Sequence, residues 1–319
     1  MANFGQARPR RIGVLDLGSN TVLLLVIDAS GRVIRERSCI TRLGQGVFAS
    51  GGLAAEAVER TRAVIADFSA QARSDGVERL VAVGTEALRC ARDGAEFLAD
   101  LVRDGLVDGA RLLSGEEEAV AAVEATRQRI GPACEALAVI DVGGGSTEIA
   151  WRERSAGPIH GLSLPLGSVR LTEALLPRHP IPDEDLARVR DAVRRESEPL
   201  ARALPNGLPS GAAVVAVAGT ATTLVALELA LATWDAERVE GFEVDAATLA
   251  TWIERLARLG VAERKRLPGL EPGRADVIVA GLVTLEGVLE RLFAPRFAVS
   301  GQGVRHGVAL RVLAGQMVI

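Results

Sequence analysis

The chain has 319 residues, of which 48% are hydrophobic and 24% charged, with a net charge of −4 and an isoelectric point near 5.6. This composition excludes an intrinsically disordered chain and argues against a general nucleic-acid-binding protein, which would usually carry a basic surface. The length predicts two domains, and an acidic protein can still bind a polyanion in a locally basic cleft.

The N-terminal sequence, the cysteines and the histidines limit the compartment and the kinds of site that the protein can have. The N-terminal MANFGQARPRR lacks the apolar core of a signal peptide, and the apolar run at residues 22–27 is too short to span a bilayer. The cysteines form no CxxC pair and the histidines no HExxH motif, which argues against a disulfide framework and a zinc hydrolase site. We therefore expect a cytoplasmic protein without membrane or nucleic-acid partners. The thiols expected to be free and buried are Cys39, Cys90 and Cys134.

The first part of the chain reads as a strand meander followed by alternating helices and strands. Apolar runs broken by glycine turns predict the strands, and helical spacing of apolar residues predicts the helices. In chain order these are strands at Arg11–Leu17, Thr21–Asp28 and 33–42, a helix at 53–73, a strand at 80–83, helices up to about residue 105, a strand at 111–113 and a helix start at 114.

The same order then begins again. The predicted elements are strands at Leu137–Val142, 148–152 and 159–164, helices at 168–176 and 183–204, a strand at 213–218, helices at 224–231, 246–259 and 275–292, a strand at 297–300 and a helix at 303–316. A strand, glycine turn, strand, strand unit thus occurs twice, which indicates an internal duplication. We expect one domain at 1–125 completed by 303–319, and a second at 126–302.

The first candidate site motif is the turn DLGSNT at the end of the first strand. Asp16 ends the strand, Gly18 lets the backbone approach a ligand closely, and Ser19, Asn20 and Thr21 add polar donors. A plain hairpin turn has the same composition, so this motif alone decides nothing.

The second motif, DVGGGSTE, is the stronger signal. Gly143, Gly144 and Gly145 are entropically expensive for a mere turn and suit a backbone cradle around phosphate, with Ser146 and Thr147 beside them. The flanking Asp141 and Glu148 make sense beside a phosphate where a cation or a water must be held.

A third motif, SGEEEA, opens the helix at residue 114. Glu116 and Glu117 are explained by the helix dipole alone. Glu118 lies shortly before the second glycine loop in sequence, and a helix running back from this point could aim its carboxylate at that loop. Such a group could act as the general base that deprotonates an attacking water.

Two glycine loops on duplicated hairpins resemble the phosphate loops of the actin-like superfamily, and AGTATT (218–223) fits that superfamily's third loop. The chain as a whole resembles the exopolyphosphatase / guanosine-pentaphosphate phosphatase family. The motifs that carry this resemblance, in order, are DLGSNT, GTEALRCA, LSGEEEA, VIDVGGGSTE, SLPLGSVRLTE, AVAGTATTL and RADVIVAG.

The resemblance implies two duplicated actin-like (ribonuclease H-like) α/β domains, with mixed sheets flanked by helices and a ligand cleft between them. It implies a Mg²⁺-dependent, or other divalent-cation-dependent, phosphohydrolase that acts on polyphosphate or guanosine pentaphosphate, and it implies that a homodimer can form. Glu118 is the implied base, Asp141 and Arg89 are further catalytic residues, and Arg170 is a weaker candidate phosphate ligand. Asp141 and Glu148 are the implied metal ligands. The implied phosphate-binding residues are Asp16, Gly18, Ser19, Asn20, Thr21, Gly143, Gly144, Gly145, Ser146, Thr147, Gly219 and Thr220.

The sequence departs from the family pattern near its end, where Gly301 and His306 replace acids that are usual there. The helical extensions of longer members are also missing after Ile319, so we do not expect high processivity on long chains. Two other functions stay open: a phosphotransferase of the same fold that uses polyphosphate or ATP, and a sensor that binds an alarmone or polyphosphate without turnover.

Overall fold

The computed structural model describes residues 10–130, 135–154 and 157–319, which form two compact units. The first unit comprises Met1–Leu113 with Val304–Ile319, and the second comprises Ser114–Gly303. We expected the first domain to extend to residue 125. In the structure helix α5 (Gly115–Ile130) belongs to the second unit, because it packs on β6, β7 and β8.

The first unit contains a five-stranded mixed sheet with the order β3-β2-β1-β4-β5. Strand β1 pairs antiparallel with β2 and parallel with β4. Its elements are β1 (Arg11–Leu17), β2 (Thr21–Asp28), β3 (Val33–Ile40), α1 (Val47–Ser50), α2 (Ala55–Ser74), β4 (Arg79–Gly84), α3 (Glu86–Cys90), α4 (Gly94–Arg103), β5 (Gly109–Leu112) and α14 (Val304–Leu313).

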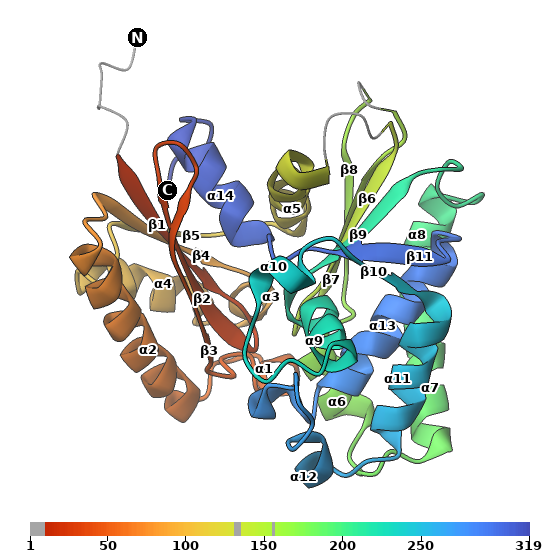
Figure 1. The fold of residues 1–319 in the computed structure, drawn as a ribbon. Helices are drawn as coiled ribbons and strands as arrows, with labels where there is room; N and C mark the ends of the chain where they lie inside the picture. The colour runs from red at the N-terminus through yellow and green to blue at the C-terminus, as the bar shows by residue number, and fades with distance from the viewer. Residues whose placement is uncertain (1–9, 131–134, 155–156) are drawn as a thin grey trace. The chain divides into compact units, whose positions relative to one another are not determined.

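Helices cover both faces of this sheet (Figure 1). Successive strand residues face opposite ways, and Leu15, Leu17 and Leu24 join one core with Ile65 and Phe68 of α2. The other face of β1 and β2 is covered by α14. Asp16 lies between Leu15 and Leu17 in the strand, so its side chain is on the α14 face.

The second unit contains a six-stranded sheet with the order β10-β11-β9-β6-β7-β8. Besides α5, its elements are β6 (Leu137–Val142), β7 (Thr147–Arg152), β8 (His160–Leu164), α6 (Ser168–Leu175), α7 (Asp183–Glu196), α8 (Glu198–Ala203), β9 (Ala213–Val217), α9 (Ala218–Glu228), α10 (Ala236–Val239), β10 (Phe242–Asp245), α11 (Ala246–Ala257), α12 (Val261–Arg264), a 3-10 turn (Pro272–Arg274), α13 (Ile278–Arg291) and β11 (Arg296–Val299).

In the second unit, too, alternating side chains of the strands pack into two different cores, one on each face of the sheet. Ile140 and Val142 join the large core that contains α9, α11 and α13. Val139 and Ala150 face the other way and pack with Ala119, Ala122 and Val123 of α5. Figure 1 shows α5 and α13 on opposite sides of this sheet. Because Asp141 shares the parity of Val139, its side chain lies on the α5 face.

The two sheets repeat each other in register. In the first unit Asp16 pairs with Leu23 across β1 and β2, and in the second Asp141 pairs with Glu148 across β6 and β7. Strands β4 and β9 then add in parallel to β1 and β6. The prediction of duplicated α/β domains with mixed sheets flanked by helices is confirmed. The repeat also shows that only the second hairpin carries a carboxylate pair.

Several local predictions are wrong. The helix expected at 224–231 begins earlier, as α9, and the short helices α1, α10 and α12 were not predicted. The helix expected at 183–204 is interrupted at Ser197, because Pro199 has no N–H and its ring would clash within a continuing helix. The four-residue edge strand β10 was not predicted. Finally, Cys90 is exposed and Cys39 only half-buried, although both are free thiols as expected. Cys134 lies outside the described residues.

Across the described ranges, none of the helices has both the length and the apolar character needed to cross a membrane.

Candidate functional site

The first loop, residues 18–21, is held by a second turn, residues 41–44. Within the first loop, the Gly18 N–H donates to the Thr21 carbonyl at 3.1 Å. From the 41–44 turn, the N–H groups of Thr41 and Arg42 donate to the Asn20 carbonyl at 3.0 and 2.9 Å, and the Gly44 N–H donates to the Ser19 carbonyl at 2.7 Å. In a trans peptide the C=O and N–H point in opposite directions, so the N–H groups of Asn20 and Thr21 point away from the 41–44 turn. This arrangement suits an anion at the loop.

The side chain of Asn20 supports a ligand at the same place. It is only 7% exposed, and neither Oδ1 nor Nδ2 has a hydrogen-bond partner among the residues that the structure describes. A buried amide without partners is costly, and native structures rarely leave one unsatisfied. The Asn20 amide is therefore a candidate ligand-binding group of the first loop.

Asp16 lies at the end of β1 and is buried. Burial raises the pKa of its carboxyl to about 6, against the opposing charge of Arg305 from α14. Part of the Asp16 population is therefore protonated near neutral pH, and its ionised form is the costly one.

The pH dependence of stability should reveal this buried acid. A carboxyl whose pKa is higher in the folded than in the unfolded chain stabilises most at low pH, and this contribution is lost as the pH rises through 6. We expect Asp16→Asn to gain about 1–2 kcal/mol relative to the wild type between pH 5 and pH 8. Urea unfolding of both proteins at the two pH values measures the difference. An equal difference at both values would contradict a raised pKa.

Arg89 is on α3 of the first unit, just after β4. Its guanidinium forms an ion pair with Glu86 at 2.8 Å and also donates to the Leu113 carbonyl. The start of the same helix is tied to β1, because the Thr85 hydroxyl donates to the Leu17 carbonyl at 3.3 Å. The structure thus gives the Arg89 guanidinium protein acceptors in its own unit.

The second loop, residues 143–147, is held from behind by the start of α6. The N–H of Ser168 donates to the Gly143 carbonyl, and those of Val169 and Arg170 donate to the Gly144 carbonyl, at 2.9–3.1 Å. The N–H groups of Gly144 and Gly145 therefore point away from α6. Gly167 permits this contact, since a Cβ there would lie 2.3 Å from both the Gly144 oxygen and the Gly145 carbonyl carbon.

The hydroxyl groups near the second loop already donate to protein acceptors. Ser146 donates to Glu148 at 2.6 Å, Thr147 donates to the Leu166 carbonyl, and Thr220 donates to the Val142 carbonyl at 3.2 Å. A hydroxyl has one proton. In this arrangement the backbone N–H groups, rather than these side chains, are the donors that the loop offers to an anion.

Asp141 and Glu148 form a buried carboxylate pair on the α5 face of the sheet. They are 8% and 3% exposed and lie directly opposite each other on β6 and β7. The Glu148 Oε1 atom accepts hydrogen bonds from Ser146 and from Ser163 of β8, at 2.6 and 2.7 Å. These two hydroxyls fix the orientation of the carboxylate. Ser163 was missed in the sequence because only strand pairing brings it to Glu148.

Glu118 is on α5 and only 4% exposed. The start of this helix packs tightly on β8: a Cβ at Gly115 would lie 2.3 Å from the Ser163 Cβ, and one at Gly161 would lie 3.3 Å from the Ala119 Cβ. The helix thus covers the sheet face that carries Asp141 and Glu148. The second unit therefore carries Glu118 on the helix that covers the sheet face of the carboxylate pair, and the second loop joins the two strands that bear this pair.

The segment predicted as a third loop, residues 218–223, forms the first turns of α9, which begins directly after β9. Ala218 has a positive φ of 63°, which a residue with a Cβ rarely adopts. A Cβ on Gly219 would lie 2.0 Å from the Arg274 Nη1 atom, so the guanidinium lies directly over this glycine. Arg274 is the arginine of the RADVIVAG motif, and no role was predicted for it.

The two departures from the family pattern have local explanations. Glu240 closes the turn at Gly301 by accepting from the Ser300 hydroxyl at 2.8 Å and from the Gly301 N–H at 3.0 Å. His306 lies 2.9 Å from Glu36 of β3, which Arg305 also contacts at 3.2 Å. Burial would raise the pKa of Glu36, but the hydrogen bonds and charges of His306 and Arg305 outweigh it and lower this pKa to about 2.

The carboxylate pair fits the implied cation in ligand type. Mg²⁺ prefers oxygen ligands and is commonly held by one or two carboxylates together with water and substrate phosphates. Within the described part of the chain, no group of three or more His, Cys, Asp or Glu side chains is placed to hold an ion without help. Asp141 and Glu148 therefore suit an ion that is shared with a phosphate ligand.

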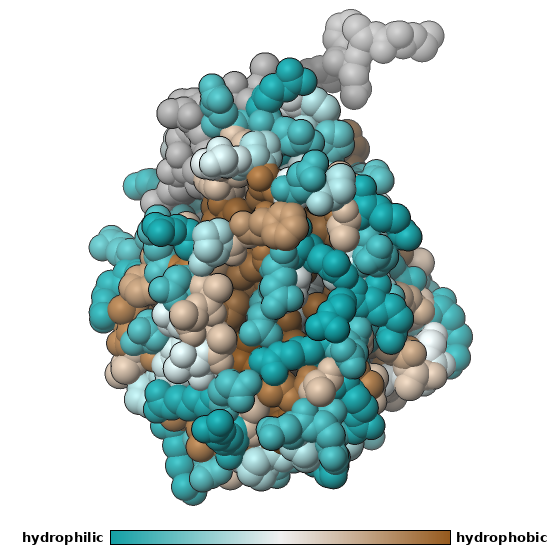
Figure 2. Space-filling view, turned by 90° about the vertical axis from the view of Figure 1, so that its right-hand side faces the viewer, coloured by the Kyte–Doolittle hydropathy of each residue, from teal (hydrophilic) through white to brown (hydrophobic). Residues whose placement is uncertain are grey.

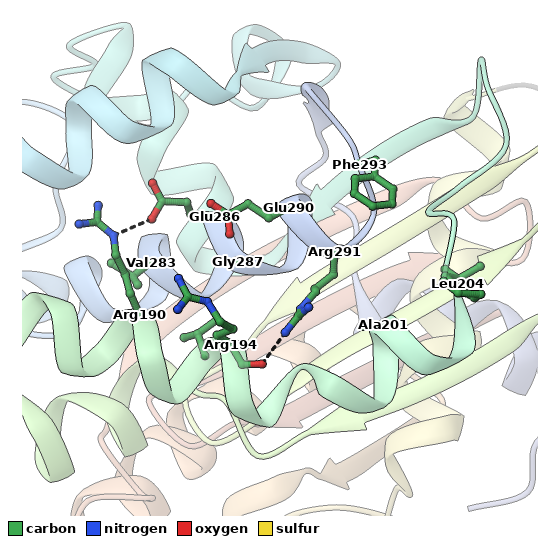
Figure 3. Close-up of a pocket in the computed structure, with 12 residues that line it drawn as sticks. Arg190, Arg194, Ala201, Leu204, Val283, Glu286, Gly287, Glu290, Arg291 and Phe293 are labelled. Atoms are coloured by element: carbon green, nitrogen blue, oxygen red, sulfur yellow. Dashed lines mark hydrogen bonds and ion pairs between the residues drawn. The ribbon is translucent and has the colours of Figure 1, made fainter.

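A cavity of about 260 Å³ lies elsewhere, between α7, α8 and α13 (Figure 3). Seen from this side, the second unit shows hydrophobic residues between ridges of hydrophilic ones (Figure 2). Arg190 and Arg291 line the cavity, but Arg190 pairs with Glu286 and Glu254, and Arg291 donates to Ser197 and the Arg194 carbonyl. None of the predicted site residues lines it.

The sequence matches the Ppx/GppA phosphatase family over residues 26–315. It is 33% identical over 320 residues to Exopolyphosphatase 2 of Mycobacterium tuberculosis, a match that covers 96% of this chain and 99% of that protein. To Exopolyphosphatase 1 of Mycobacterium leprae it is 30% identical over 313 residues, covering 95% and 89%.

Solved structures show the same fold. A Ppx/GppA family member from Aquifex aeolicus matches with a TM-score of 0.77 at 30% identity, covering 97% of this chain and all of that one. An exopolyphosphatase-like protein matches with a TM-score of 0.86 at 26% identity, covering 96% and 100%. These matches confirm the predicted actin-like fold class and the family resemblance. The chain belongs to the Ppx/GppA phosphatase family.

Proposed function

We propose that the protein releases the terminal orthophosphate of inorganic polyphosphate, with Glu118 as the general base. The observation that carries this proposal is that the buried Glu118 is on α5, the helix that covers the sheet face of Asp141 and Glu148, and that these two flank a glycine loop whose N–H groups face away from α6. The relatives named exopolyphosphatase, which match over nearly the whole chain, support the same substrate class.

The chemistry follows from these groups. The N–H groups of Gly144 and Gly145 bind oxygens of the terminal phosphoryl group and offset its charge. A water attacks the terminal phosphorus, its proton passes to Glu118, the bond to the bridging oxygen breaks, and the shortened chain leaves with that oxygen. Asp141 and Glu148 would hold a Mg²⁺ ion, which when bound neutralises charge on the phosphate oxygens. The first loop, with Asn20, binds further phosphate groups of the substrate.

Buried carboxylates distinguish turnover from simple binding. Placing Glu118, Asp141 and Glu148 beside a polyanion weakens binding, since like charges repel. The arrangement is useful where a proton must be taken from water and a cation must be held in the transition state. The buried carboxylates therefore favour an enzyme over a sensor.

The test is phosphate release from tripolyphosphate, short polyphosphate, long polyphosphate and guanosine pentaphosphate, each with Mg²⁺ and with EDTA. The proposal expects Mg²⁺-dependent release from at least one polyphosphate, and the ranking decides whether guanosine pentaphosphate is also a substrate. Release that appears only with ADP as phosphate acceptor would identify a phosphotransferase instead. Tight binding without any release would identify a sensor.

A further inference from the structure

The duplicated architecture gives the two loops equivalent supports. The 41–44 turn follows β3, the third strand of the first unit, and the start of α6 follows β8, the third strand of the repeated unit. Each support donates backbone N–H groups to carbonyls of its loop. In each, one donor is an arginine: Arg42 to the Asn20 carbonyl at 2.9 Å, and Arg170 to the Gly144 carbonyl at 3.1 Å.

The backbone of Arg42 is in an unfavourable conformation. Its φ is 54°, in the left-handed region where a Cβ meets the neighbouring carbonyl and where glycine or asparagine is usual. In the described ranges, the other non-glycine residues with positive φ are Ala218, Ala230 and Phe293. Residues held in such conformations tend to occur at ligand sites. Glycine would adopt this conformation without strain, so the backbone of the turn does not itself require an arginine.

The ligand chemistry at this place is anionic. The 41–44 turn directs the N–H groups of Asn20 and Thr21 away from itself, and Asn20 has a buried amide without partners. Thr41 is fully buried, and its hydroxyl likewise has no partner among the described residues. Arg42 contacts this same loop through its backbone N–H, which donates to the Asn20 carbonyl. A guanidinium binds phosphate oxygens in a planar, two-pronged manner.

We propose that Arg42 is a substrate-binding residue of the first loop, the counterpart of Arg170 at the second, and that its guanidinium binds a phosphate group of the polyphosphate. This inference rests on the proposed function and adds a specific ligand to it. The first loop then carries its own cation, although it lacks the carboxylate pair of the second loop.

Arg42→Gly provides the sharpest test, because glycine removes both the strain of the positive φ and the positive charge. We expect KM for tripolyphosphate to rise about 10- to 100-fold, the usual effect of losing a charge-assisted hydrogen bond. The midpoint of thermal unfolding should be unchanged or higher. Arg42→Lys should restore part of the affinity, and Arg42→Asn, which tolerates the same backbone, should behave as the glycine variant does.

Ala230→Gly is the matched control, since it relieves a positive φ of 47° at an exposed position outside the predicted site. Its KM should equal that of the wild type. A wild-type KM in both Arg42→Gly and Arg42→Asn would overturn the proposal. So would a KM increase in Arg42→Gly that the folded Arg42→Asn variant does not share, since the turn backbone would then be the cause.

A direct binding measurement separates this inference from the proposed function. Calorimetric titration with tripolyphosphate in EDTA reports affinity without turnover. Should the wild type release no phosphate from any substrate but bind tripolyphosphate more tightly than Arg42→Gly does, the hydrolase proposal fails and the role of Arg42 stands. Equal affinities of the two proteins would remove Arg42 from the site even if hydrolysis is observed.

Discussion

Replacing Glu118 by glutamine should lower kcat for phosphate release by about 10²- to 10⁴-fold, the usual contribution of a general base. The substitution keeps the shape of a side chain of α5 that is only 4% exposed. Binding of tripolyphosphate should persist, because the glycine-loop N–H groups are untouched and one negative charge is removed. Steady-state phosphate release and calorimetric titration measure the two quantities.

The control for this variant lies in the same helical turn. Glu116 is exposed, and we explain its charge by the helix dipole. Glu116→Gln should retain wild-type kcat, so a loss shared by both variants would indicate that the charge of the first turn matters rather than one specific base. Near-normal kcat in Glu118→Gln would remove this residue from the mechanism.

Replacing Gly167 by alanine should damage both the fold and the second loop. The added Cβ would meet the Gly144 oxygen and the Gly145 carbonyl carbon at 2.3 Å, and these backbone atoms can yield only by moving the loop. We expect a loss of about 1–3 kcal/mol in unfolding free energy, as for other overpacked sites. We also expect kcat/KM to fall about 100-fold, since a displacement near 1 Å of positioning groups has that effect.

Gly260→Ala serves as the comparison for that experiment. Gly260 precedes α12 with an ordinary negative φ, and its added Cβ would meet only the end of the flexible Glu263 side chain, at 3.3 Å. Urea unfolding and phosphate release should both stay close to wild type. If Gly167→Ala behaves like Gly260→Ala, the second loop is not held as tightly by α6 as its hydrogen bonds indicate.

The sequence predicted strands best where an apolar run of ordinary strand length ends at residues with strong turn preferences. Strands β1 and β2 match the prediction residue for residue, because each apolar run ends at residues with strong turn preferences. Strand β10 was missed because four residues are too few for their alternation to stand out, and the strand is defined by pairing with β11, far along the chain. The helix break at Ser197 could have been predicted, since Pro199 gives a direct physical reason for it.

The site shows the same division between local and long-range information. The glycine-rich motifs identified both loops, and strand parity explains why Asp141 and Glu148 share a face. The sheet to which α5 belongs depends on the packing of Ala119 and Ala122 against distant strands, which periodicity does not report. The 41–44 turn was overlooked for a similar reason, because its significance lies in hydrogen bonds to Asn20.

The division of the first unit into two segments has a consequence for synthesis on the ribosome. Strands β1 and β2 emerge early, but the helix that covers one of their faces, α14, is translated only after the whole second unit. Until then that face lacks its apolar cover, and His306 has not yet reached Glu36. The second unit, a continuous segment, can complete its fold first. The nascent first unit is therefore the part of the chain most exposed to aggregation and to chaperone binding.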